Sequence, residues 1–143
     1  MSTINGADSS AAHWPGPVRV MVCVGYNPVS QLLIRRAGQL ARAFSGDLLA
    51  VHIQAAASDA PGYRAMLEQN LALARELGAR VLVEQGNDIA HVLARVAQTH
   101  GVTHLVVGES ARSRWQEIRT GSLVRQLLRA SHGIDVYIVA DPA

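Results

Sequence analysis

The chain alternates between short, almost wholly apolar runs and longer segments in which apolar residues recur every three or four positions. Continuous runs of valine, leucine and isoleucine are typical of parallel strands that are covered on both faces. The runs therefore predict five strands, at Val18–Val24, Leu48–Ile53, Arg80–Glu84, His104–Gly108 and Asp135–Ala140.

The segments between these runs have the spacing of amphipathic helices. We expect helices over residues 32–44, from Pro61 to Leu77, after a cap at Asp88, and from Gly121-Ser122 onward. Strands that alternate with helices are joined by right-handed crossovers. The pattern predicts an α/β protein, namely a Rossmann-like, open, parallel five-stranded sheet with helices on both faces.

Residues 1–17 are rich in serine, alanine, glycine and proline and have no periodic apolar pattern, so we read them as a flexible leader or linker. A single domain over residues 18–143 is the expectation for a chain of this length. No apolar run approaches the roughly 20 residues of a membrane helix. We therefore expect a cytoplasmic protein without direct membrane insertion.

The type of basic residue in the chain restricts the binding sites and reactions that can be expected. All 13 basic residues are arginine. A Walker-type phosphate loop and Schiff-base catalysis both require lysine, so neither is expected. Arginine still binds phosphate and carboxylate groups through its planar fork.

Two loops follow the ends of predicted strands where ligands of such sheets bind. The first is Gly25-Tyr26-Asn27-Pro28, and the second runs from Gly108 to Gly121-Ser122. Glycine lets the backbone approach a ligand closely, and Ser122 at a helix start would cap amide groups that attract anions. Residues 109–132 carry five arginines against two glutamates, a sum of +3 (5 − 2). This segment therefore favours an anionic ligand over a plain connecting loop.

The segment fits the universal stress protein pattern Gly-x2-Gly-x9-Gly-Ser/Thr at Gly108, Gly121 and Ser122, with Ala111 in place of the second glycine. The runs Val22-Cys23-Val24-Gly25-Tyr26-Asn27-Pro28-Val29-Ser30 and Ile134-Asp135-Val136-Tyr137-Ile138-Val139 add to this likeness. Together with Arg114-Trp115 and Gly121-Ser122-Leu123-Val124, they resemble the cytoplasmic universal stress protein domain of KdpD-type osmosensitive potassium sensor histidine kinases.

The resemblance implies a universal stress protein fold of the adenine nucleotide alpha hydrolase-like type. It also implies a non-catalytic signalling domain that docks a protein partner or an anionic ligand through the arginine-rich loop, whereas a KdpD-type parent would itself be a sensor histidine kinase. The alternative is a universal stress protein that binds ATP or another adenine nucleotide. A homodimer through the last strand is a further expectation for such a domain.

Carried over residue by residue, the resemblance gives two predicted sites. The nucleotide or anion site would comprise Gly25, Asn27, Ser30, Val51, Gly108, Arg112, Arg114, Gly121 and Ser122. Partner docking would use Arg112, Arg114, Trp115 and Arg119. Two departures weaken nucleotide binding: Ala111 adds a methyl group to the phosphate loop, and Asn27 and Ser30 stand where relatives usually offer an acidic residue. Leu48-Leu49-Ala50-Val51-His52 also lacks the Phe-Thr-Ala-x-Tyr stretch that binds cyclic di-AMP in some sensor kinases.

Other chemistry is not expected. His100 and His104 have the spacing of a helical zinc pair, but Gly101 breaks that helix, so we predict no metal site. His52 is expected to be a strand histidine bonded to the backbone. We assign no catalytic residue, because Glu109, directly after Gly108, is the only candidate and its expected role is pairing with arginine. Aromatic residues make up only 4% of the chain, so nucleic acid is not an expected partner.

Overall fold

A computed structural model describes residues 17–54, 61–108 and 133–140. Five strands form one parallel sheet in the order β4-β3-β2-β5-β6. The strands are β2 (Arg19–Cys23), β3 (Asp47–Gln54), β4 (Arg80–Gln85), β5 (His104–Gly108) and β6 (Asp135–Val139). The helices are α2 (Val29–Ala43), α3 (Pro61–Glu76) and α4 (Ile89–Thr99).

The predicted α/β class and all five predicted strands are confirmed, with ends that differ by at most one residue. Three of the four predicted helices are also present, and the first begins at Val29, three residues before its apolar stripe. The predicted helix that starts at Gly121-Ser122 lies outside the described residues, as does the predicted leader apart from Pro17.

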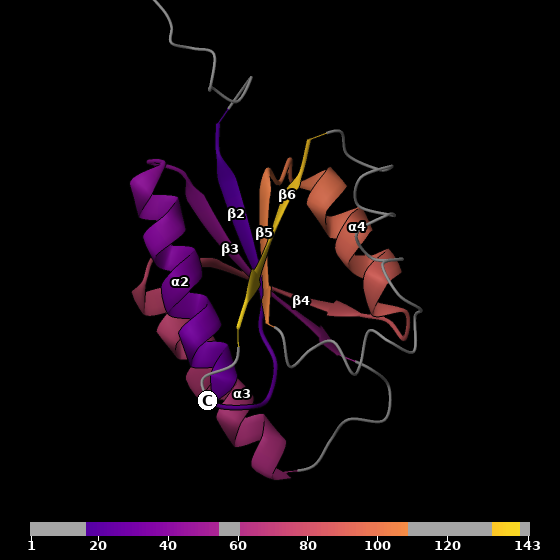
Figure 1. Cartoon of the computed structure of the whole chain (residues 1–143). Coiled ribbons are helices and arrows are strands. Elements are labelled where there is room, and N and C mark those ends of the chain that lie inside the picture. The colour runs from indigo at the N-terminus through magenta and orange to yellow at the C-terminus, as the bar shows by residue number, and fades with distance from the viewer. Residues whose placement is uncertain (1–16, 55–60, 109–132, 141–143) are drawn as a thin grey trace, which may run out of the picture.

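Helices cover both faces of the sheet, with α2 and α3 on one face and α4 on the other (Figure 1). Alternate residues of the central strands therefore enter two separate cores. Val20, Val22 and Val106 pack under α2 and α3, whereas Met21 and Leu105 pack under α4. Burial on both faces explains why these strands read as continuous apolar runs.

All three helices end in the same way, with their last carbonyls accepting hydrogen bonds from the following backbone. The second residue after each described helix has a positive φ, at Ser45 (54°), Gly78 (90°) and Gly101 (64°). The next amide then bonds back five residues: Gly46 N to Ala41 O at 2.8 Å, Ala79 N to Ala74 O at 2.9 Å, and Val102 N to Ala97 O at 2.9 Å. This is the Schellman arrangement, and it satisfies the terminal carbonyls locally.

At its start, α4 is capped as predicted, because the Asp88 carboxylate accepts a hydrogen bond of 3.2 Å from the His91 amide. None of the helices among the described residues is long and apolar enough to cross a membrane.

Candidate functional site

Strand order changes direction between β2 and β5, since the chain continues from β2 to β3 and β4 on one side and reaches β5 and β6 on the other. Ligands of open α/β sheets bind beyond the carboxyl ends of the strands at such a point. The loop after β2 and the end of β5 meet there. The structure therefore brings Gly25 and Gly108, two predicted site residues, to the same edge of the sheet.

The loop after β2 is fixed to the start of α2 by a predicted site residue. The Gly25 amide donates a hydrogen bond of 2.9 Å to Ser30 Oγ, and Ser30 is almost fully buried. The Ser30 amide in turn donates to Asn27 O at 3.1 Å. Ser30 thus acts on the conformation of the loop, while the side chain of Asn27 is exposed.

Gly108 ends β5 against α2. A Cβ atom built at this position would lie 3.1 Å from Leu33 Cδ1, so a larger residue would press on the helix. Val51 of β3 is fully buried, and its carbonyl accepts a hydrogen bond of 2.8 Å from the Val24 amide. The predicted residues Arg112, Arg114, Trp115, Arg119, Gly121 and Ser122 lie outside the described residues, as do Ala111 and Glu109.

Asn70 of α3 belongs to this site, although the sequence analysis did not identify it. Its side chain is fully buried, and Nδ2 donates to Gly25 O at 2.9 Å and to Asn27 O at 3.1 Å. The amide orientation is fixed by these two acceptors, because the opposite orientation would place oxygen against oxygen. Oδ1 is buried and has no hydrogen-bond partner among the residues that the structure describes. One side chain from α3 therefore holds two carbonyls of the loop after β2.

The sequence contains a feature that points to a special role for Asn70, but this feature alone is not conclusive. It occupies an apolar position of its helix, beside Leu67, Leu71 and Ala74. A polar residue on the buried face of a helix has to find hydrogen-bond partners, which makes it a candidate for a structural or functional contact.

His52 of β3 extends the network on the same face of the sheet. Its Nδ1 lies 2.8 Å from Val24 O, which confirms the expected bond to the backbone. A carbonyl only accepts, so Nδ1 carries the proton. Nε2 lies 3.3 Å from the Tyr26 hydroxyl, and the two rings meet edge to face with centroids 4.9 Å apart. Tyr26 also packs on Tyr63 of α3, at 5.3 Å. These two tyrosines were not predicted as site residues.

His100 and His104 do not form a pair. His100 is the C-terminal cap of α4, whereas His104 is buried in β5 with Nδ1 2.7 Å from Thr103 Oγ1. Within the described ranges, no group of three or more histidine, cysteine or acidic side chains could hold a metal ion. Burial lowers the pKa of His104 below its usual 6.5, an effect that the Asp135 carboxylate partly opposes.

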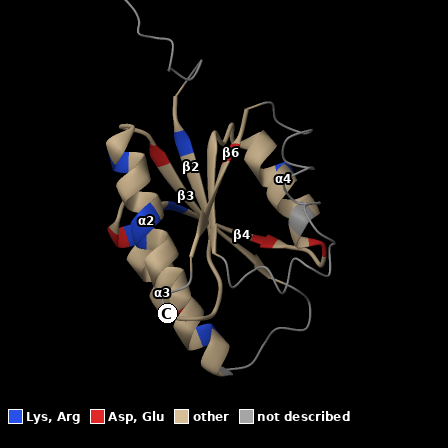
Figure 2. Ribbon diagram, viewed as in Figure 1, with Lys and Arg blue, Asp and Glu red and all other residues tan. Residues whose placement is uncertain are grey.

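Charged residues of the described elements are spread over α2, α3, α4 and the strands, with both signs interspersed (Figure 2). The loop after β2 contributes no acidic side chain to the carboxyl edge, and the first turn of α2 contains none. Nor does any side chain cap the N-terminus of α2. This end of the site is therefore suited to neutral or anionic groups.

A sequence profile described as the universal stress protein family matches residues 18–140. Among curated proteins, the sensor protein KdpD of Mycobacterium tuberculosis (strain CDC 1551 / Oshkosh) is 35% identical over 132 residues, which are 92% of this chain and 15% of that protein. A putative sensor protein KdpD of Synechocystis sp. (strain ATCC 27184 / PCC 6803 / Kazusa) is 28% identical over 94% of this chain and 36% of its own length. The chain thus spans well under half the length of these relatives.

Solved structures share the fold. A universal stress protein in complex with cAMP superposes with a TM-score of 0.61 and 24% identity, covering 85% of this chain and 95% of the other. A universal stress protein of Archaeoglobus fulgidus in complex with dAMP gives a TM-score of 0.56 and 18% identity, covering 85% of this chain and 97% of the other. The open parallel sheet described above is the fold of these proteins.

Proposed function

Because the chain belongs to the universal stress protein family, we propose that it is a non-catalytic signalling domain that binds an adenine nucleotide at the carboxyl edge of its sheet. In a KdpD-type sensor kinase, such a domain would report the bound ligand to the rest of the protein. The matched KdpD proteins are much longer than this chain, so kinase activity and a response to potassium or osmotic stress would belong to the whole sensor. A cytoplasmic location is part of the same proposal.

The observation that carries the proposal is the way in which the loop after β2 is held in position. Asn70 and Ser30 bind its backbone groups through buried hydrogen bonds of 2.9 to 3.1 Å. A loop fixed in this way loses little conformational entropy when a ligand binds. Such a pre-organised loop is expected of a ligand site more than of a loop that only connects β2 to α2.

The arrangement of the strands suits a nucleotide. β5, β2 and β3 are adjacent, so the ends of β5 and β3 are two strand spacings apart, roughly 10 Å. A nucleotide could place its phosphate beyond Gly108 and its base near the end of β3. The uncapped start of α2 would face the ribose or a phosphate between them. Nucleotide complexes of two structural neighbours, with cAMP and dAMP, support this choice of ligand.

Calorimetric titration of the purified protein with ATP and with cAMP tests the proposal, with cyclic di-AMP as the comparison ligand. We expect micromolar binding of at least one adenine mononucleotide, on the order of −8 kcal/mol. Cyclic di-AMP should bind weakly or not at all. Absence of binding by both mononucleotides would refute the proposal.

Docking of a protein partner through Arg112, Arg114, Trp115 and Arg119 is the second candidate. It is favoured by the charge of +3 that residues 109–132 carry (5 − 2). Replacing the three arginines by glutamine should abolish capture of the partner, whereas replacing the exposed Arg35 of α2 should not. If capture survives the triple replacement, this candidate is wrong.

A further inference from the structure

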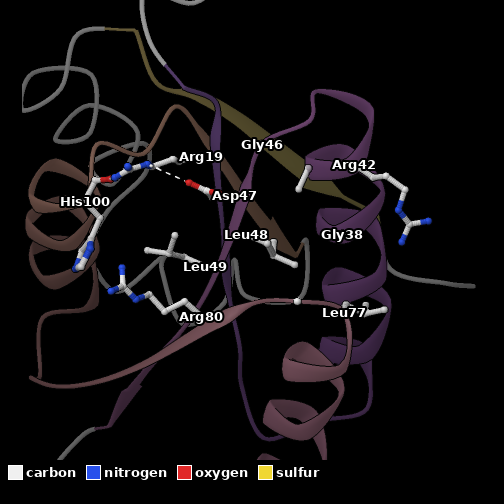
Figure 3. Close-up of a pocket in the computed structure, with 12 residues that line it drawn as sticks. Arg19, Gly38, Arg42, Gly46, Asp47, Leu48, Leu49, Leu77, Arg80 and His100 are labelled. Atoms are coloured by element: carbon white, nitrogen blue, oxygen red, sulfur yellow. Dashed lines mark hydrogen bonds and ion pairs between the residues drawn. The ribbon is translucent and has the colours of Figure 1, made fainter.

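A hollow of about 420 Å³ opens at the amino-terminal edge of the sheet, opposite the loop after β2 (Figure 3). The starts of β2, β3 and β4 form part of its wall, and the C-terminal ends of α2, α3 and α4 form the rest. Its volume lies in the range of small-molecule sites. It is separate from the proposed nucleotide site, because the two lie at opposite ends of the same strands.

Positive charge predominates in this hollow. Among the described residues, Arg19, Arg42 and Arg80 line it together with a single acidic residue, Asp47. Asp47 Oδ2 lies 3.5 Å from Arg19 Nε and so pairs with Arg19. In the part of the chain that the structure describes, Arg42 and Arg80 have no ion-pair partner.

The register of the strands places Arg19 and Arg80 on the same face of the sheet. Arg19 is aligned with Asp47, and Arg80 is aligned with Leu49, which packs in the core under α4. Figure 3 shows the guanidinium groups of Arg19 and Arg80 on the same side of the hollow as the imidazole of His100, whereas Arg42 extends away on the other side. Groups from β2, β4 and the end of α4 therefore surround one apolar floor at Leu49.

The simplest alternative is that the arginines only neutralise the C-terminal ends of three helices, where cations are favoured. The hydrogen bonds argue against this explanation for Arg80. Each helix closes its own last carbonyls through the Schellman arrangement, with bonds of 2.8 or 2.9 Å to the following backbone. The one carbonyl capped by an arginine is His100 O, which accepts from Arg19 Nη1 at 2.8 Å. Arg80 therefore keeps its donors for an external acceptor.

We infer that this hollow binds a small oxyanion, with its carboxylate or phosphate group on Arg80, Arg19 and His100. A guanidinium offers paired N–H groups that match either oxyanion. Leu49 is almost fully buried, so the hollow offers a ligand little apolar surface.

Amide chemical-shift titration of the ¹⁵N-labelled chain tests this inference. The probes are inorganic phosphate, acetate and hexanoate, each to about 10 mM and at constant ionic strength. We expect saturable shifts confined to Arg80, Leu49 and Gly101, and similar binding of hexanoate and acetate, because Leu49 is almost fully buried. Tighter binding of phosphate than of either carboxylate would identify the oxyanion as a phosphate.

Two variants distinguish a specific binding site from non-specific electrostatic effects of the added anions. Arg80→Gln should weaken binding by at least about tenfold, whereas Arg36→Gln, at an exposed position of α2 outside the hollow, should leave it unchanged. Shifts that are scattered over the surface, that do not saturate, or that survive in Arg80→Gln would overturn the inference. Because no nucleotide is used, the result is independent of the proposed function.

Discussion

Asn70→Leu is the substitution that best tests the organisation of the carboxyl edge. The leucine has a similar volume but cannot donate to Gly25 O and Asn27 O, which now accept at 2.9 and 3.1 Å. A hydrogen bond of this kind contributes about 0.5 to 1.5 kcal/mol, and an unpaired buried group costs about 1 to 3 kcal/mol. Asn27 O keeps a bond from the Ser30 amide, so the main loss falls on Gly25 O. Removal of the unpartnered Oδ1 offsets a part of this cost.

We expect the free energy of unfolding to fall by about 2 kcal/mol, measured by urea denaturation with an unchanged slope. Nucleotide affinity should also fall. This loss should be seen at temperatures where the variant is still fully folded, so that unfolding does not account for it. Gln69→Leu is the matched control, since its side chain is exposed on the same helix and should change stability by no more than about 0.5 kcal/mol. If Asn70→Leu lowered the free energy of unfolding by no more than this control, the loop would not depend on Asn70 and the reasoning would be refuted.

Three further predictions concern other elements. Burial lowers the pKa of His104 below 6.5 in the folded state, so the unfolded chain takes up the proton first as the pH falls. The free energy of unfolding should therefore decrease as the pH drops below 6.5. His104→Gln should reduce this pH dependence, measured by urea denaturation at several pH values. An unchanged pH profile in this variant would contradict the assignment. Asp88→Ala should cost about 1 kcal/mol of unfolding free energy, because the His91 amide loses its cap, and thermal unfolding would detect this change. Ala111→Gly should tighten ATP binding in calorimetry, since it removes a methyl group from the predicted phosphate loop; equal or weaker binding would argue against that pose.

The fold could be predicted from the sequence because its signal is local. Each strand is a run of apolar residues, and each described helix has its own stripe and end signal, such as Asp88 before α4 and Gly78 after α3. The element ends were less accurate, because α2 begins with Val29 on the loop side of its apolar stripe. Ser30, in this first turn, is buried and accepts a hydrogen bond from the Gly25 amide, a contact that the apolar stripe does not reveal.

The candidate site could be predicted only in part. Gly25, Ser30 and Gly108 were predicted from the resemblance to the family, and their binding roles stay predictions. Asn70 was missed because its acceptors lie 43 and 45 residues away in the chain. His52 was understood as a backbone-bonded histidine, but its contact with Tyr26 follows only from the three-dimensional arrangement of β3 and the loop.

The helix ends and the loop after β2 differ in how far along the chain their closing hydrogen bonds reach. At the amino edge, each helix is closed by bonds between residues five positions apart, which can form as soon as the helix does. At the carboxyl edge, the loop after β2 depends on His52 and Asn70, which join it only when β3 and α3 are docked. Contacts between distant residues form late in folding, because chain entropy must be lost before they are gained. The hydrogen bonds that hold the loop after β2 would thus be complete only once α3 has docked, and a chain still emerging from the ribosome would lack the fully held loop until α3 had been made.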